Sequence, residues 1–303
     1  MIISPVMKFI VDKEVGYPAP TEKEKLDRAI GKFRRILTNL TGTFNIAETK
    51  FGLADMLVGR NSPGDHQEAM RLYNYILDVA PTSYLRARGL VGKAELLIES
   101  DQKKDLDDAI SLCEKAIDIL KDDLSDFFTA KAFVVEAEIL AKLGDGGRKK
   151  AGKLLDKVIR HKEANVYFRA RAMVGRAELP LYLAKPKGLD QAIKFSSEAS
   201  KLLSDRPTDY FAVKPKIITA ELLIRRAKKD DLGKAQMLCL KVIAVRSAEK
   251  SLIARAKLDL AEISRHPKAE KLYKEVLEME GIDPYLVQKA KMIEKSVKKA
   301  KKK

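Results

Sequence analysis

The sequence predicts an all-α protein, an α-solenoid of about six helix-turn-helix repeats. Three observations lead to this prediction. A twelve-residue pattern returns along the chain, as RARGLVGKAELL at 86–97 and as RARAMVGRAELP at 169–180. Apolar residues recur in each copy at helical spacing, and a second amphipathic segment follows each copy after a turn. A single helical hairpin cannot bury its apolar faces, but stacked hairpins can, which explains the repetition.

The first helix of each repeat, helix A, contains an alanine that we use as an anchor. The anchors lie 40 to 43 residues apart: Ala54, Ala94, Ala137, Ala177, Ala220 and Ala261. A small residue or valine stands seven positions earlier, two helical turns away on the same face. A bulky apolar residue stands three positions before each anchor, so helix A presents a stripe that a neighbouring helix can approach closely.

The second helix of each repeat, helix B, is anchored by another alanine. These anchors are Ala69, Ala109, Ala151, Ala192, Ala235 and Ala269. The turns between helices supply Ser83, Asp126 and Asp209 as expected N-caps. A further helix is expected at about 22–40, preceded by a capping box from Thr21 to Glu24.

The repeats resemble the tetratricopeptide-repeat (TPR) superfamily over roughly residues 22–285. The likeness is carried by the small residue late in helix A and by the helix B alanine followed by bulky residues, as in HPKAEKLYKEVLEMEGIDP at 266–284. The resemblance implies a right-handed superhelix whose A helices line the concave side, and a partner-binding function. HEAT and armadillo repeats are the alternative, but a proline falls in or beside helix A in only two units, at Pro180 and Pro215.

Two charged stripes run along the A helices. Six positions before the anchor stand Glu48, Arg88, Lys131, Arg171, Lys214 and Arg255; one position after it stand Asp55, Glu95, Glu138, Glu178, Glu221 and Glu262. The stripes are either an ion ladder between repeats or a partner-binding groove. Seven residues along the axis and one interhelical spacing leave a gap of roughly 13–14 Å, which is long for direct contact unless tilt between the layers shortens it. Within a helix, Glu138–Lys142 and Glu221–Arg225 have the spacing of an ion pair.

The composition indicates a folded, basic protein. Of the 303 residues, 46% are hydrophobic and 34% charged, which excludes a disordered chain, and the net charge is +16. Such a charge favours an acidic partner, nucleic acid or an anionic surface. Residues 286–303 carry +7 of it as a helix or tail, with Lys298, Lys299, Lys301, Lys302 and Lys303 as possible anion contacts.

Domain boundaries and location follow from the same reading. We expect an N-terminal extension or cap at 1–21, the repeat domain at 22–285 and the basic tail at 286–303. No apolar run reaches 18 residues and the first residues lack signal-peptide features, so we expect a cytoplasmic protein without a membrane span. Cys113 and Cys239 are expected as small core residues in a reducing compartment.

No motif predicts catalysis, a metal or a cofactor. His66, His161 and His266 lie in different units without a second ligand at metal-binding spacing. The stretch GDGGRKK at 144–150 follows a helix and lacks the phosphate-loop signature, so we interpret it as a turn between helices. An enzyme is therefore not expected.

Three functional hypotheses remain. The first is a scaffold or adaptor that binds a protein or peptide, with an acidic segment, through the groove formed by Arg88, Lys131, Arg171, Lys214 and Arg255 with Glu95, Glu138 and Glu178. The second is a nucleic-acid-associated protein that uses the basic stripe and the lysine tail on phosphates. The third is a structural or self-assembling subunit whose groove stays empty.

Overall fold

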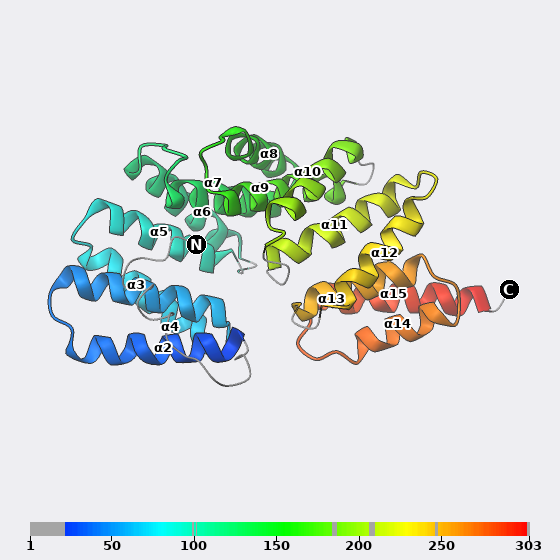
Figure 1. Ribbon diagram of the computed structural model, residues 1–303, viewed down its shortest axis with the longest axis horizontal. Helices are drawn as coiled ribbons and strands as arrows, with labels where there is room; N and C mark the ends of the chain where they lie inside the picture. Colours follow the sequence, from blue (N-terminus) through cyan, green and yellow to red (C-terminus); the bar gives the residue numbers. More distant parts are fainter. Residues whose placement is uncertain are drawn as a thin grey trace. The chain divides into compact units, whose positions relative to one another are not determined.

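The computed structural model describes residues 22–98, 100, 102–183, 187–205, 210–245 and 248–301. This part of the chain contains fourteen α-helices, one short 3-10 helix and no strand (Figure 1). Consecutive helices pack as hairpins, and each A helix also packs on the next A helix of its unit. The expected all-α class and the helix-turn-helix solenoid are confirmed.

The chain divides into two compact units, which we describe separately. One consists of Met1–Leu154 with His161–Asn165, and the other of Leu155–Arg160 with Val166–Lys303. The helices up to the division are α2 (Glu22–Asn39), α3 (Thr43–Arg60), α4 (Asp65–Val79), α5 (Ser83–Leu97), α6 (Lys103–Ile119), α7 (Phe127–Lys142) and α8 (Asp145–Arg160), whose last six residues belong to the second unit. The helices after it are α9 (Val166–Glu178), η1 (Leu179–Tyr182), α10 (Leu189–Leu202), α11 (Tyr210–Arg226), α12 (Asp231–Ile243), α13 (Lys250–Glu262), α14 (Lys268–Leu277) and α15 (Pro284–Lys301).

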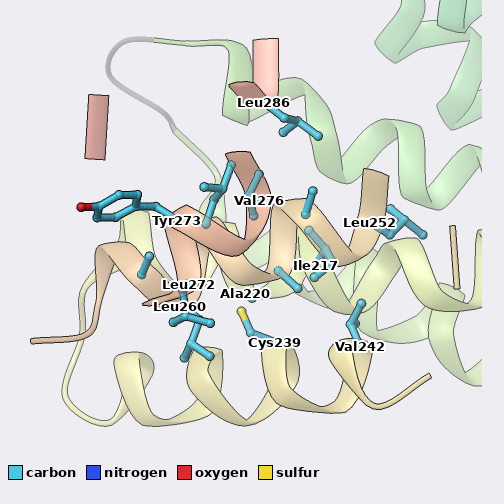
Figure 2. Close-up of a cluster of buried hydrophobic side chains, with 14 of the residues drawn as sticks. Ile217, Ala220, Cys239, Val242, Leu252, Leu260, Leu272, Tyr273, Val276 and Leu286 are labelled. Atoms are coloured by element: carbon cyan, nitrogen blue, oxygen red, sulfur yellow. The ribbon is translucent and has the colours of Figure 1, made fainter. Parts of the chain in front are cut away.

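The predicted anchors form the core. All six A anchors and all six B anchors are buried, none more than 3% exposed. Figure 2 shows one cluster of the second unit. Ile217 and Ala220 of α11 pack with Cys239 and Val242 of α12, and Leu252 of α13 belongs to the same cluster. The small anchors let helices approach closely, and the bulky neighbours fill the space between them.

The contact between each B helix and the A helix that follows it is complementary in volume. A side-chain Cβ added at Gly92 of α5 would lie 2.4 Å from the Tyr73 ring of α4, and one at Gly52 would lie 2.9 Å from Phe33. In the next seam the sizes at the equivalent positions are reversed: α6 has the small Cys113 where α4 has Tyr73, and α7 has the larger Val135 where α5 has Gly92. Cys113 and Val135 belong to one buried cluster. In each of these seams one helix supplies a large side chain and the other a small residue, so the two helices can pack closely.

The helix termini agree with the sequence in part. Asp126 caps α7 as expected, since its carboxylate accepts bonds from the Phe128 and Thr129 amides at 2.8 and 2.9 Å. The cap of α5 is Thr82 and not Ser83, whose backbone is already helical; the Thr82 hydroxyl accepts from the Leu85 amide at 3.1 Å. Thr21 and Asp209 lie outside the described residues.

The turn at 144–150 is shorter than its composition predicts. Gly144 has φ +88°, the left-handed conformation that ends α7, and α8 begins at Asp145. Gly147 therefore lies in the first turns of α8. A Cβ at this residue would lie 2.1 Å from the Leu140 carbonyl oxygen, so close helix packing explains this glycine.

A size exchange tests the α4–α5 seam. Gly92→Val should lower the free energy of unfolding by about 1–3 kcal/mol, because a branched side chain collides with the Tyr73 ring. Adding Tyr73→Cys reproduces the Cys113/Val135 combination of the next seam, so a double-mutant cycle by urea denaturation should give a favourable coupling of about 1 kcal/mol or more. Additive effects of the two substitutions would contradict this account of the seam.

Candidate functional site

The two charged stripes meet on the surface formed by the A helices of each unit, which we call the A-helix face. The basic residue of one A helix binds the acidic residue of the A helix before it. Lys131 Nζ lies 2.7 Å from Glu95 Oε2, and Lys214 Nζ lies 2.8 Å from Glu178 Oε2. Arg255 places Nη2 at 2.8 Å from Glu221 Oε2. These side chains are all partly buried, so each pair joins two successive layers of the solenoid with little solvent screening.

Ion pairs also join the first two A helices and the last two, but other residues supply part of each pair. In the first layer Arg88 binds Glu48, which occupies the otherwise basic position of α3. In the last layer Lys289 of α15 binds Asp259 at 2.8 Å and Glu262 at 3.3 Å. Glu138 of α7 and Arg171 of α9 occupy the corresponding positions in different units.

The ion-ladder alternative is the one that the structure shows, although the gap between the stripes is long. That gap is measured between points on the helix axes, and side chains from both helices extend into it. An extended lysine places its nitrogen about 6 Å from its Cα, and an extended glutamate reaches about 4–5 Å, so together with one hydrogen bond they span the gap of roughly 13–14 Å. Long side chains at both positions are therefore needed for the ladder to form.

The expected pair within one helix, Glu221–Arg225, is replaced by contacts between helices. Glu221 is bound by Arg255, while Arg225 Nη1 donates to the carbonyl oxygen of Leu183 at 3.2 Å. Lys142 of α7 makes the equivalent bond to the carbonyl of Ile98. Cations five positions after the anchor thus satisfy carbonyl groups at or just beyond the end of the preceding A helix.

Aromatic rings accompany the cations, a feature that our sequence reasoning missed. The guanidinium carbon of Arg88 lies 4.2 Å from the centroid of the Phe51 ring, and that of Arg171 lies 4.9 Å from the Phe211 centroid. Part of this pattern was present in the sequence, where an aromatic residue stands ten positions before the anchor in five of six repeats: Phe44, Tyr84, Phe127, Tyr167 and Tyr210. Two of these rings lie near cations, because the Tyr84 centroid is 5.9 Å from the Arg88 guanidinium carbon and the Tyr210 centroid is 5.6 Å from Lys214 Nζ. Phe44 and Tyr84 are exposed. The A-helix face therefore presents rings as well as paired charges.

The charges of the second unit form a connected network. Glu178 lies 3.6 Å from Arg255 in addition to binding Lys214. Burial lowers the pKa of Lys214, but Glu178 and Tyr210 more than offset this and the net pKa is raised. Burial and the neighbouring Glu221 raise the pKa of Asp259 to about 7, although Lys289 offsets part of the shift. One oxygen of Asp259, Oδ2, is buried and has no hydrogen-bond partner.

The remaining candidate groups have structural roles. Within the described residues, no cluster of three or more histidine, cysteine or acidic side chains could hold a metal ion. Cys113 and Cys239 are buried and free, and burial raises the pKa of the Cys239 thiol to about 12, so that it stays protonated. In the segment expected as a tail, Leu286, Ala290 and Ile293 of α15 are buried, so its first half belongs to the core.

The lysine tail is described only in part. Lys298 lies 2.7 Å from Glu294 on the same helix, and Lys299 is exposed. Lys301 ends α15, while Lys302 and Lys303 lie outside the described residues. Among the described helices, none combines the length and the apolar composition that a membrane span requires.

Comparison with known proteins supports the fold. The sequence matches no protein-family model and no curated protein. The structure is similar to the crystal structure of yeast Tom70, a TPR-repeat protein, with a TM-score of 0.52 and 15% sequence identity. The match covers 96% of this chain and 67% of the yeast chain. At this identity the likeness shows the fold alone, and it confirms the TPR-like α-solenoid that the repeats predict.

Removing one partner of a ladder pair should destabilise the protein. Lys214→Met leaves the partly buried Glu178 without its closest cation, and we expect a loss of about 2–4 kcal/mol in the free energy of unfolding by urea denaturation. Adding Glu178→Gln should recover part of the loss, because no uncompensated carboxylate remains there. Lys229→Met, at an exposed lysine, should change stability by less than about 0.5 kcal/mol. Equal effects of Lys214→Met and Lys229→Met would show that the ladder contributes nothing.

The raised pKa of Asp259 gives stability a pH dependence of known sign. With a pKa of about 7 in the folded protein and about 3.9 in the unfolded chain, the folded state binds the extra proton between these values. Its contribution to the free energy of unfolding should therefore increase by about 1 kcal/mol per unit as pH falls from about 7 to about 4. The measurement is the difference in unfolding free energy between wild type and Asp259→Asn across this range; a difference that is flat or of opposite slope would refute the assignment.

Proposed function

We propose that this chain is a non-enzymatic helical-repeat scaffold or adaptor that binds a protein or peptide partner across the A-helix face. The main support is the periodicity of that surface. An aromatic ring, a cation and a carboxylate recur at equivalent positions of successive A helices, so a partner lying across the layers meets the same set of groups at each step. Repeated, partly exposed rings and charges suit an extended peptide or an amphipathic helix.

The proposed contact residues are those at the charged stripes and beside them. They are Arg88, Lys131, Arg171, Lys214 and Arg255, with Glu95, Glu138 and Glu178. We retain an acidic segment as the partner's feature, with one refinement from the ion ladder. A ligand carboxylate has to share a cation that already holds a carboxylate of the chain, as Arg255 holds Glu221. The partner therefore requires contacts to the rings as well as charge.

Substitution of a basic-stripe residue by glutamate does not test this surface at Arg171, because Arg171 is buried against Phe211 and Arg171→Glu would disturb the fold. Tyr84 and Tyr182 are better positions, since both rings are exposed, one in each unit. Tyr84 lies near the Arg88 cation and Tyr182 follows Glu178 by one helical turn.

Binding can be tested by affinity purification from native extract followed by mass spectrometry, with and without nuclease. Wild type should recover a stoichiometric protein partner that survives nuclease, and Tyr84→Ala with Tyr182→Ala should reduce its recovery at least tenfold. Met292→Ala, at an exposed position of α15, is the matched control and should retain the partner. Recovery that is unchanged by the tyrosine substitutions would contradict the adaptor proposal.

The same experiment separates the two alternatives. Nucleic-acid association, through the basic stripe and Lys298 to Lys303, would appear as nuclease-sensitive recovery that falls steeply with salt and after truncation behind Val297. That truncation point spares Leu286, Ala290 and Ile293, which a cut at 286 would remove from the core. A self-assembling subunit would show concentration-dependent light scattering instead.

The division of the chain and its location belong to the same proposal. We assign 1–21 to a cap or extension, 22–285 to the repeat domain and 286–303 to a basic helix and tail, although α15 begins at Pro284 and its apolar side chains join the core. We place the protein in the cytoplasm, on the support of two free, buried cysteines in different units.

A further inference from the structure

Helix α12 has an apolar surface on the side that faces solvent. Leu232, Met237 and Leu240 are 49%, 59% and 45% exposed. Cys239 and Val242 point from the same helix into the buried cluster (Figure 2), so the three exposed side chains lie away from the core. We call this surface, which also contains Gly233 and Gln236, the α12 face.

The other B helices of the chain show that such a surface is unusual here. The exposed residues of α6 are all charged, and those of α14 are three lysines, Lys268, Lys271 and Lys274. On α10 the exposed side chains are Asp190, Gln191, Lys194 and Lys201. Helices of the same repeat position are therefore normally polar toward solvent, and the apolar α12 face is not a requirement of the fold.

The α12 face has ridges of side chains and a groove between them, as helix–helix packing requires. Leu232, Gln236 and Leu240 form one row at four-residue spacing, and Gly233 and Met237 begin the next. A Cβ added at Gly233 would meet no atom within 4 Å, so no contact inside the chain requires a glycine at this position. Its missing side chain leaves a hollow beside Leu232 and Met237 that can receive a side chain from a second helix.

Charge indicates what kind of helix fits. Lys234 and Lys241 border the α12 face, and Lys229 lies before its start; all three are exposed. Positive potential extends to α11, where burial and then the charge of Lys241 lower the pKa of Lys216. A second copy of this chain would oppose these lysines with its own, and the chain as a whole carries +16, so self-association is disfavoured.

The α12 face is only one helix wide, which favours a helix over a lipid bilayer as its partner. The apolar side chains belong to α12 alone, and α10, which packs beside α11, exposes Asp190 together with lysines. A bilayer would contact these polar tips along with the leucines, whereas a single helix covers only α12. The backbone of α12 is internally bonded as a helix, so an extended strand has no edge to join.

We propose that the α12 face binds an amphipathic helix of a partner protein, with apolar residues at i, i+3, i+4 and i+7 and acidic residues beside them. This site is independent of the A-helix face, and one partner can occupy either without the other. Covering these three side chains removes their remaining exposed apolar surface from water and supplies the main attraction for the partner helix. The acidic flank pairs with Lys234 and Lys241 and sets the orientation.

The test is selection of a displayed library of amphipathic helical peptides against the full-length protein, with acidic, neutral and basic residues allowed at the flanking positions. The selected peptides are then measured by fluorescence anisotropy. We expect enrichment of acidic flanks and at least tenfold weaker binding to Met237→Lys. Met292→Lys, which makes the same exchange at an exposed position of α15, should bind as wild type does. Lys234→Glu with Lys241→Glu should weaken acidic peptides and favour the same peptides with lysine flanks.

Each other outcome overturns the proposal. No enrichment, enrichment of basic flanks, or equal binding by Met237→Lys and Met292→Lys would exclude an acidic helix at this site. Sedimentation with phosphatidylserine-containing vesicles that depends on Met237 while no peptide is selected would assign the face to a membrane surface, and a Met237-dependent dimer in analytical ultracentrifugation would assign it to a second copy. Tyr182→Ala should leave peptide binding unchanged, so failure here is distinguishable from failure at the A-helix face.

Discussion

The structure depends on the close approach of each A helix to the hairpin before it. A hairpin in isolation leaves one apolar side uncovered, and only the next hairpin removes it from water. The approach is possible because the side chains that meet have complementary sizes. Where α4 presents Tyr73, α5 has Gly92, and where α7 presents Val135, α6 has Cys113. Continuity of the stack thus rests on a volume rule and not on a conserved residue at each position.

The charged ladder follows from the same stacking. Once the layers are in register, the basic position of one A helix faces the acidic position of the previous one, and long side chains close the distance. The pairs are partly buried, so an unmatched member would be costly, and the α15 lysine at 289 completes the last layer with Asp259 and Glu262. Stability and surface chemistry are therefore set by the same residues. A partner on the A-helix face meets charges that already have a structural role, in contrast to the α12 face, where apolar side chains are about half exposed.

Much of the fold could be predicted, and less of the site. Periodic alanines predicted the helices and the core, because a small residue that is buried in every repeat recurs in the sequence at a spacing of about forty positions. The charged positions were also found, but Glu221 was assigned to Arg225 on its own helix when it binds Arg255 on the next. Local spacing is readable along one helix, whereas a contact between repeats depends on how the layers are offset. The aromatic positions such as Tyr84 were readable at the same period and were overlooked.

The sequence by itself determined the all-α class, the period of the repeat, the anchors of both helices and the absence of a recognisable catalytic motif. Each of these is a one-dimensional property, set by residue type and spacing within a single helix. Only the tertiary structure decided which carboxylate each cation binds, that Asp259 is buried with an unpaired oxygen, and that Leu232, Met237 and Leu240 are left on the outside of α12. Exposure and pairing depend on the neighbours that folding brings together, and an apolar helical residue reads the same in sequence whether another helix covers it or not.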